Sequence, residues 1–210
     1  MSLYDMSKEA LRPVFGVDID GTIGEYHGHF ARFASEWLGR DLPDPAKYEE
    51  GSFYGYLGIS RSTYRKIKLA YRRGGLKRSM PVIDGAQSLV SSLRERGALV
   101  VLCTTRPYLS LENIDEDTRH WSRRNQIVHD SIIWGEHKYQ ELARFGDRLV
   151  GVIDDDLSMI KQAENCGIRS FIHARPYNNI GPDDYANRGN INVARDIMSL
   201  WLDQWEGKNL

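Results

Sequence analysis

The sequence predicts an α/β fold: a Rossmann-like parallel sheet with helices on both faces and a small helical cap inserted after the first strand. Three observations support this prediction. Short, continuous apolar runs recur along the chain, which is typical of strands buried on both faces. Segments with helical apolar spacing separate these runs. Between residues 24 and 79, no convincing buried strand interrupts a helical pattern.

The strands and helices are expected in alternation. Strands are predicted at 14–19, 98–103, 131–134, 149–153 and 168–172, the first two of them buried. Helices are predicted from the spacing of apolar residues at 82–96, 138–145, 157–166 and 193–205. Gly97 and Gly167 directly follow two of these helices, where glycine commonly ends a helix. The segment 177–192, rich in Asn, Asp and Gly, is expected to be a surface loop.

The insertion after the first strand is expected to be mostly helical. Its first helix is indicated by the spacing of five apolar residues, namely Phe30, Phe33, Ala34, Trp37 and Leu38. Ser60 is expected to cap a second helix, and the aromatic, Gly-rich segment 53–58 between them to form a loop. An insertion at this point would lie over the carboxyl end of the sheet, as a lid does. We therefore divide the chain into a core (1–23 and 80–210) and a cap (24–79).

The composition is that of an ordinary globular protein. The 210 residues are 41% hydrophobic and 27% charged, with a net charge of -1, which gives no general attraction to nucleic acid or anionic membranes. No apolar run approaches the length of a membrane span, and the polar, mixed-charge residues 1–12 do not resemble a signal peptide. Cys103 and Cys166 are isolated, so we expect two buried thiols in a cytoplasmic protein.

The segment 14–23 gives the strongest chemical signal. Its apolar run ends in Asp18 and Asp20, whose side chains point to the same side of a strand. Crowded carboxylates repel each other unless a cation or a proton lies between them. Gly21 allows a tight turn and the close approach of a ligand. This pattern favours a ligand site at the strand end, although an Asp-rich turn without a function would explain the segment taken alone.

Three further segments place polar residues at expected strand or helix ends. Thr104 and Thr105, followed by Arg106, end the second strand and suit an anionic oxygen. Lys138 begins a helix after the third strand. The acidic triplet 154–156 ends the fourth strand, and it exceeds the single residue that a helix cap needs, which implies a cation. Each segment alone also has a plain structural explanation.

Taken in order, these four segments resemble the motifs of the haloacid dehalogenase-like (HAD) hydrolase superfamily: Asp-Ile-Asp-Gly-Thr, a strand ending in Thr, a Lys at a helix start and a strand ending in Asp-Asp. The resemblance covers residues 13–22 and about 81–175, with the insertion where the family has its helical cap. It implies a phosphatase in which Asp18 attacks phosphorus to form an aspartyl-phosphate. Asp20 would act as general acid and then as general base.

The resemblance also implies a Mg²⁺ cofactor. Asp18, the backbone carbonyl of Asp20 and Asp154 would bind the ion, and Asp155 would support the metal or its waters. Asp156 departs from the family pattern, because many relatives have a basic residue at that position.

The same resemblance suggests which residues hold the substrate. Thr104 and Lys138 would hold the transferring phosphoryl oxygens, with Thr105 and Arg106 beside them. Within the superfamily, the chain is most similar to the 5′(3′)-deoxyribonucleotidases, because the cap is short and helical, two hydroxyls are adjacent and the cap is rich in aromatic residues. Tyr54 and Tyr56 are the rings expected to stack on a base, whereas Phe30, Phe33 and Trp37 are expected in the cap core. The expected partner is therefore a small phosphate monoester, namely a nucleotide.

Two alternatives stay open. The segment 117–121 is similar to the polynucleotide phosphatase branch, and the basic residues between 61 and 78 could follow the phosphates of a nucleic-acid end. A solvated helix face is the more common explanation of such a run. There is no phosphate-binding loop of the kind that a kinase half would need. The other alternative is a protein that only binds, or a phosphotransferase, on the same fold.

Overall fold

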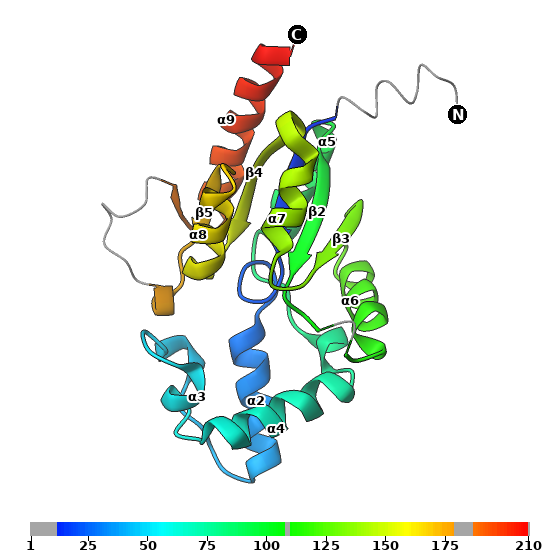
Figure 1. Cartoon of the computed structure of the whole chain (residues 1–210). Helices are drawn as coiled ribbons and strands as arrows, with labels where there is room; N and C mark the ends of the chain where they lie inside the picture. The colour runs from blue at the N-terminus through cyan, green and yellow to red at the C-terminus, as the bar shows by residue number, and fades with distance from the viewer. Residues whose placement is uncertain (1–11, 108–109, 179–186, 210) are drawn as a thin grey trace.

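The predicted α/β fold is confirmed by the computed structural model, which describes residues 12–107, 110–178 and 187–209. Within these residues, six parallel strands form one sheet in the order β3-β2-β1-β4-β5-β6 (Figure 1). The strands are β1 (Val14–Asp18), β2 (Leu99–Thr104), β3 (Ser131–Trp134), β4 (Leu149–Asp154), β5 (Ser170–His173) and β6 (Arg188–Gly189).

The first strand lies in the middle of the sheet, where the order of the strands reverses. β1 pairs with β2 on one side and with β4 on the other. Asp18 is opposite Cys103, and Val17 is opposite Ile153, so Asp18 and Asp154 end neighbouring strands at the same level. Open α/β sheets bind ligands in the crevice at this reversal, outside the carboxyl ends of the strands.

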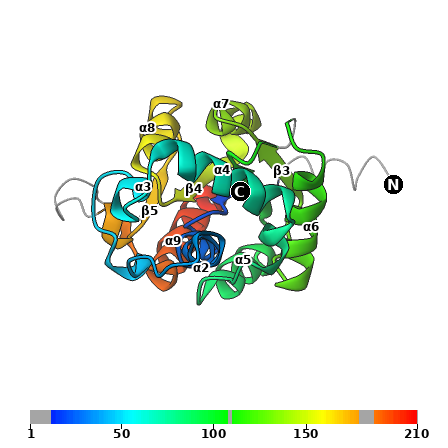
Figure 2. The ribbon, with the colours of Figure 1, turned by 90° about the horizontal axis from the view of Figure 1, so that it is seen from below.

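Helices cover both faces of the sheet, as predicted. One face is covered by α7 (Lys138–Leu142) and α8 (Leu157–Asn165), and the other by α5 (Ala86–Glu95) and α9 (Ile191–Asn209), as the view from below shows (Figure 2). Successive side chains of a strand point to opposite faces of the sheet, so each strand packs against both helix layers. Val14, Val101 and Val152 pack with Leu142 on the first face, and Phe15 faces the opposite side. The sheet is therefore buried on both sides.

Residues 24–79 lie at the carboxyl end of the sheet (Figure 1), and we call them the cap segment. The segment contains α2 (Tyr26–Leu38), η1 (Pro45–Lys47), α3 (Phe53–Tyr56), α4 (Arg61–Arg73) and η2 (Leu76–Ser79). The predicted cap of α4 is confirmed, because the Ser60 hydroxyl accepts a hydrogen bond from the Thr63 N–H at 3.1 Å. Phe30 and Tyr71 are buried in the same hydrophobic cluster as Val17 of the sheet. The cap segment therefore shares a continuous core with the sheet.

The structure corrects three expectations. The segment predicted as a loop at 53–58 begins with the helix α3, because the Ser52 hydroxyl accepts from the Gly55 N–H and starts a helical turn. Trp37, expected in the cap core, is 55% exposed near the end of α2. The region 177–192 is not all loop, because η4 (Pro176–Asn178) overlaps its start and β6 pairs with β5 further on; its residues 179–186 lie outside the described residues.

Other elements were not anticipated from the sequence. The helix α6 (Asn113–Arg124) follows β2, and among its buried residues only Ile114 and Trp121 are large and apolar. Asp117, Thr118 and Ser122 are buried with them, so the apolar periodicity is weak. The predicted helix 138–145 is shorter than expected and continues as η3 (Ala143–Arg148). No helix within the described ranges is long and apolar enough to cross a lipid bilayer.

Candidate active site

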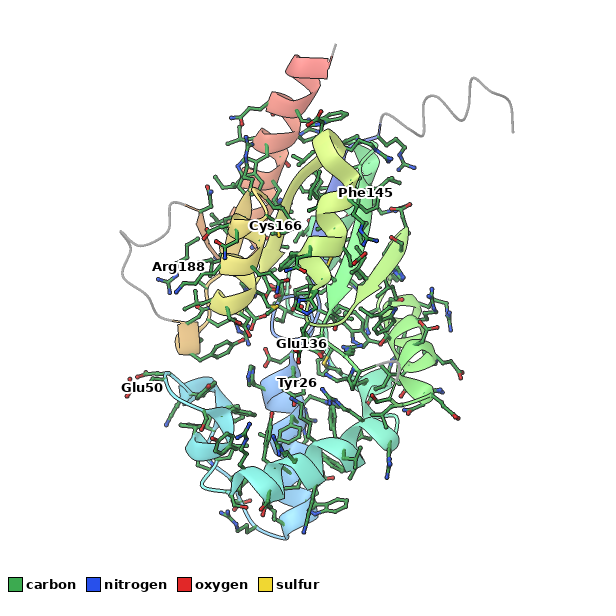
Figure 3. The ribbon with its side chains drawn as sticks, viewed as in Figure 1. Tyr26, Glu50, Glu136, Phe145, Cys166 and Arg188 are labelled. Carbon is green, nitrogen blue, oxygen red and sulfur yellow. The ribbon has the colours of Figure 1, made fainter. Side chains whose placement is uncertain are left out.

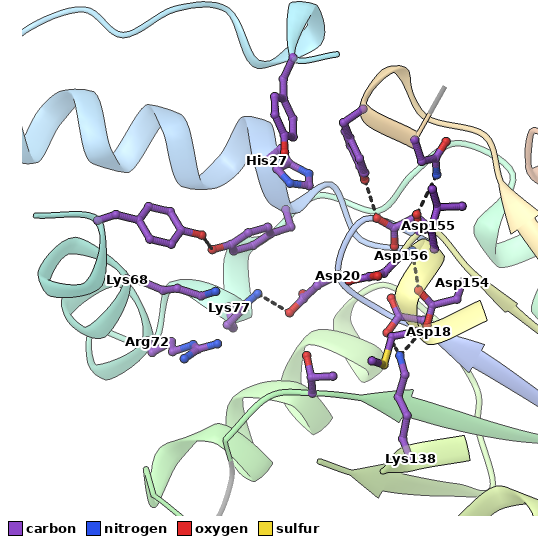
Figure 4. Close-up of a pocket in the computed structure, with 18 residues that line it drawn as sticks. Asp18, Asp20, His27, Lys68, Arg72, Lys77, Lys138, Asp154, Asp155 and Asp156 are labelled. Carbon is purple, nitrogen blue, oxygen red and sulfur yellow. Dashed lines mark hydrogen bonds and ion pairs between the residues drawn. The ribbon is translucent and has the colours of Figure 1, made fainter. Parts of the chain in front are cut away.

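Three aspartates meet at the carboxyl end of the sheet. Asp18 ends β1, Asp154 ends β4, and Asp155 follows directly. One carboxylate oxygen from each lies within 4.8 Å of the others, and all three residues are buried (Figure 4). The parallel register of β1 and β4 brings these carboxylates together, because the two strands end side by side.

Lys138 is the cation of this cluster. It begins α7, and its Nζ donates to Asp18 Oδ1 at 2.5 Å and to Asp154 Oδ2 at 2.6 Å. The Tyr139 hydroxyl donates to the same Asp154 oxygen at 2.6 Å. Lys138 thus pairs with two of the three buried carboxylates, and among the described residues no cation forms an ion pair with Asp155, so the cluster is short of positive charge.

The pKa values of the carboxylates reflect this shortage. Burial, and next the charge of Asp154, raise the pKa of Asp18 well above its usual range, although Lys138 opposes them. Burial and the charge of Asp154 likewise raise the pKa of Asp155 to about 7. The donors are carboxylate oxygens, which are the ligands that hard divalent ions such as Mg²⁺ prefer. The residues therefore fit a divalent cation, both in ligand type and in the charge that they lack.

Asp155 is oriented by groups from two distant parts of the chain. The Thr22 hydroxyl donates to Asp155 Oδ1 at 2.8 Å, and the Tyr177 hydroxyl donates to Oδ2 at 2.5 Å. The Asn178 amide donates to the Asp155 backbone carbonyl at 2.7 Å. At Gly21, where φ is +104°, an added Cβ would lie 2.2 Å from Asp155 Oδ2. A glycine is therefore required beside this carboxylate.

Asp20 has different partners. Its carboxylate accepts from Lys77 Nζ at 2.7 Å and from two nitrogens of Arg106, at 3.1 Å and 2.6 Å. Arg106 is itself buried and also donates to Thr118 Oγ1 at 2.8 Å. Burial raises the pKa of Asp20, but the charges of Arg106 and Lys77 outweigh burial and bring the pKa far below its usual range. Asp20 is therefore an ionised carboxylate in this structure.

A cavity of about 420 Å³ joins these groups to the cap segment. Figure 4 shows Asp18, Asp154 and Lys138 on one side, and Lys68, Arg72 and Lys77 on the other. Tyr26, at the start of α2, lies where the cap segment meets the sheet (Figure 3). Its ring lines the cavity together with four other aromatic side chains, namely His27, Tyr48, Tyr64 and Tyr177.

The cavity contains most of the residues selected from the motifs. Those that line it are Asp18, Asp20, Thr105, Lys138, Asp154, Asp155 and Asp156. Thr104 is buried at the end of β2, and its hydroxyl accepts from the Arg106 N–H at 3.3 Å. Arg106 reaches the site through Asp20. The Asp156 side chain also caps α8, because it accepts a hydrogen bond from the Ser158 N–H.

Tyr54 and Tyr56 are not among the residues that line the cavity. The Tyr56 hydroxyl donates to the Asp44 carbonyl at 2.6 Å, and the Tyr54 ring lies 6.0 Å from the Tyr64 ring. Successive residues of a helix point about 100° apart, so neighbouring side chains of α3 face different ways. Phe53 is the one that points inward, with its ring centre 4.5 Å from that of His27. The aromatic rings that line the cavity therefore do not include Tyr54 and Tyr56, the two that the sequence analysis selected.

Several residues at the site had no motif to identify them. Lys77 was one member of a basic run, and Tyr177 and Asn178 lie beyond β5 in a segment without a pattern. Tyr139 could have been noticed only because it follows Lys138. No signal in the sequence joins these residues, because the fold brings them together from distant positions.

Comparison with known proteins identifies relatives of this chain. No family model matches it. One curated protein, from Chlorobaculum tepidum, is 26% identical over 142 residues, which is 64% of this chain and 67% of that protein, and its name is "Putative 5'(3')-deoxyribonucleotidase".

Solved structures show the same fold at lower identity. A HAD-superfamily hydrolase of subfamily IA from Geobacter sulfurreducens has a TM-score of 0.59 at 16% identity, covering 91% of this chain and 97% of that one. Protein Tyrosine Kinase A from Mycobacterium tuberculosis has a TM-score of 0.63 at 16% identity, covering 89% and 98%. The resemblance to the HAD superfamily is confirmed at the level of the fold, on which proteins of different activities are built.

Proposed function

We propose that this protein is a Mg²⁺-dependent phosphatase that hydrolyses a nucleotide through an aspartyl-phosphate at Asp18. The observation that supports it most directly is the placement of a buried carboxylate, paired with Lys138, in a cavity whose opposite wall is cationic. A phosphate group in that cavity would find cations around its oxygens and a nucleophile beside its phosphorus. The name of the Chlorobaculum tepidum relative supports the choice of a nucleotide.

The proposed reaction has two steps. In the first, an oxygen of Asp18 attacks phosphorus, the bond between phosphorus and the leaving-group oxygen breaks, and Asp20 gives a proton to that oxygen. In the second, a water molecule attacks phosphorus and gives its proton to Asp20. The bond between phosphorus and Asp18 then breaks and releases inorganic phosphate. Lys138 and Thr105, which line the cavity, would stabilise the negative charge on the phosphoryl oxygens.

The proposed cofactor site consists of Asp18, Asp154 and the backbone carbonyl of Asp20, with Asp155 in support. A Mg²⁺ ion bound there supplies positive charge that neutralises the phosphoryl oxygens. The structural support is the cluster of buried carboxylate oxygens and its shortage of cations. Tyr139 and Thr22, which donate to Asp154 and Asp155, would keep these ligands in place.

Asp20 must change its protonation state during this cycle. Its two cations favour the carboxylate, which is the form that accepts a proton from water in the second step. For the first step, Asp20 needs a proton. A substrate phosphate would compete with Asp20 for Lys77 and Arg106, and weaker pairing would let its pKa rise. We infer that binding of the substrate prepares Asp20 as the acid.

The aromatic lining supports a nucleotide over a simple sugar phosphate. Base–aromatic stacking contributes about 1–3 kcal/mol per base where it has been measured on single strands. His27 adds a polar group, because its Nδ1 is buried without a hydrogen-bond partner among the described residues. Burial, and next the charge of Arg175, lower the pKa of His27 to about 3, so the ring is neutral and can bond to a base or a sugar hydroxyl.

Phosphate release from a panel of substrates tests the proposal. The panel contains 5′- and 3′-nucleotides, their deoxy forms, sugar phosphates and a small aryl phosphate, with Asp18→Asn as the blank. We expect release that needs Mg²⁺, stops with a chelator and is fastest with nucleotides. An unchanged rate of phosphate release in the presence of the chelator would contradict the metal assignment. Equal rates for nucleotides and sugar phosphates would contradict the nucleotidase assignment.

A further inference from the structure

The cationic wall of the cavity exceeds what one phosphate group needs. Lys68 and Arg72 come from α4 and Lys77 from η2, and Figure 4 shows all three on the side opposite Asp18 and Asp154. The reacting phosphoryl group already has Lys138 and Thr105 beside Asp18, and the proposed Mg²⁺ would add further positive charge. Lys77 is paired with Asp20. Lys68 and Arg72 are therefore left for another group.

Lys68 and Arg72 have no carboxylate within ion-pair distance in the part of the chain that the structure describes. The Nε of Arg72 is buried, and in that same part it has no hydrogen-bond partner. A guanidinium offers five donors, and burying part of it without acceptors is unfavourable. This pair is thus a set of donors without acceptors.

The spacing of the two cations along α4 brings their charges close together. They are four residues apart on α4, and therefore on the same side of the helix. Like charges at this spacing repel each other along a helix. An anion between the two would remove this repulsion and give Arg72 an acceptor.

The ammonium groups are held against aromatic rings at the cavity wall. Lys77 Nζ lies 4.1 Å from the centre of the Tyr26 ring, and Lys68 Nζ lies 5.8 Å from the same centre. Lys68 Nζ is also 5.4 Å from the centre of the Tyr64 ring. Cation–π contacts of this kind hold a charge in place without neutralising it. These contacts therefore hold the Lys68 ammonium at the cavity wall.

We propose that Lys68 and Arg72 form a second phosphate subsite, and that the preferred substrate is a nucleotide with phosphates on two ribose hydroxyls, a nucleoside 3′,5′-bisphosphate. This inference rests on the proposed function, because it assumes that the other phosphate lies at Asp18. The cavity volume of about 420 Å³ falls in the range of small-molecule sites. The rings between the two ends of the cavity would contact the nucleoside.

Rates with matched substrates test the subsite. We would measure kcat/KM for phosphate release from adenosine 3′,5′-bisphosphate, from the 5′- and 3′-monophosphates and from a 3′-phosphorylated oligonucleotide. The proteins are the wild type, Lys68→Gln, Arg72→Gln and the control Lys66→Gln, an exposed lysine of the same helix outside the cavity. We expect the wild type to prefer the bisphosphate. In the Lys68 and Arg72 variants, this preference should fall about 10- to 100-fold, mainly through KM.

Three outcomes would overturn the subsite. These are equal rates for bisphosphate and monophosphates in the wild type, an equal loss of preference in Lys66→Gln, or a better rate with the oligonucleotide than with the bisphosphate. The last outcome would instead make the cap a nucleic-acid surface.

Absence of turnover with every substrate would contradict the proposed function rather than the subsite. Calorimetric titration of the Asp18→Asn protein with the bisphosphate and a monophosphate would then decide the subsite. Tighter binding of the bisphosphate, lost on adding Arg72→Gln, supports it. Equal binding of both ligands overturns it.

Discussion

At the scale of single residues, the aspartates of the site differ in pKa because their neighbours differ. Asp18 lies in a buried cluster with one shared ammonium, whereas Asp20 faces two cations of its own. Burial and the charge of Asp154 raise the pKa of Asp18. Burial also raises the pKa of Asp20, but the charges of Arg106 and Lys77 outweigh it and lower that pKa. The first environment favours the binding of a further positive charge, whereas the second holds Asp20 as a carboxylate.

Tyr139→Phe tests the role of the groups around the proposed metal ligands. The Tyr139 hydroxyl donates a hydrogen bond to Asp154 at 2.6 Å. Without this hydroxyl, the Asp154 carboxylate loses one of the groups that fix its orientation. Because groups behind a metal ligand typically contribute 10–100-fold in affinity, we expect Mg²⁺ to bind about 10–100-fold more weakly. Tyr56→Phe, which removes a hydroxyl bonded to a backbone carbonyl outside the cavity, is the control. Equal Mg²⁺ affinities in the two variants would contradict the assignment of Asp154.

The motif residues could be predicted from the sequence, because each follows a strand or starts a helix that has a strong local pattern. Asp18, Lys138 and Asp154 meet in the structure since their elements are neighbours in a parallel sheet. Lys77 and Tyr177 could not be predicted, because only the folded chain brings them to Asp20 and Asp155.

At the scale of elements, burial explains which parts of the fold were predictable. The central strands are buried on both faces and therefore appear as continuous apolar runs. The helix α6 was missed because several of its buried positions are polar, and β6 has only two residues. The aromatic rings of the cap segment were predictable as a group but not one by one, since the turn of α3 decides which of them faces inward.

Gly21→Ala tests the turn after β1. Gly21 and Gly97 both have positive φ values, +104° and +85°, so alanine strains the backbone at either position. Only at Gly21 would the new Cβ meet another group, namely the Asp155 carboxylate; at Gly97 nothing lies within 4 Å. We expect Gly97→Ala to lower stability by about 1 kcal/mol and to keep its activity.

In the Gly21 variant, we expect a further loss of activity on the order of 100-fold, because Asp155 must move. Thermal unfolding separates the strain from the effect on the site. An active Gly21→Ala protein with only a lowered melting temperature would contradict the close packing against Asp155.

At the scale of the whole molecule, the fold buries histidines that are uncharged. Burial, and next the charge of Arg175, lower the pKa of His173 to about 4, whereas an unfolded chain has a histidine pKa of about 6.5. As the pH falls from about 6.5 to 4, the unfolded state therefore takes up a proton that the folded state excludes, so stability is lost over this range. His173 is 3% exposed, so solvent screens this effect little.

Denaturant unfolding at pH 7 and pH 4 measures this contribution. Other groups titrate in the same range, so the comparison is between the wild type and His173→Gln, with the exposed His120→Gln as control. We expect the loss of unfolding free energy on acidification to be roughly 2–3 kcal/mol smaller in His173→Gln than in the wild type. Equal losses in the wild type and the His173 variant would show that His173 takes up its proton equally in the folded and unfolded states.

The proposed mechanism requires that Asp18 becomes phosphorylated during turnover. The most direct measurement is to mix the protein with Mg²⁺ and its best nucleotide, quench with acid within the first turnovers, and determine the mass of the protein and of its peptides. We predict one added phosphoryl group on the peptide that contains Asp18 in the wild type, and none in Asp18→Asn. Release of phosphate without any phosphorylated protein, or a phosphoryl group on another residue, would contradict the mechanism.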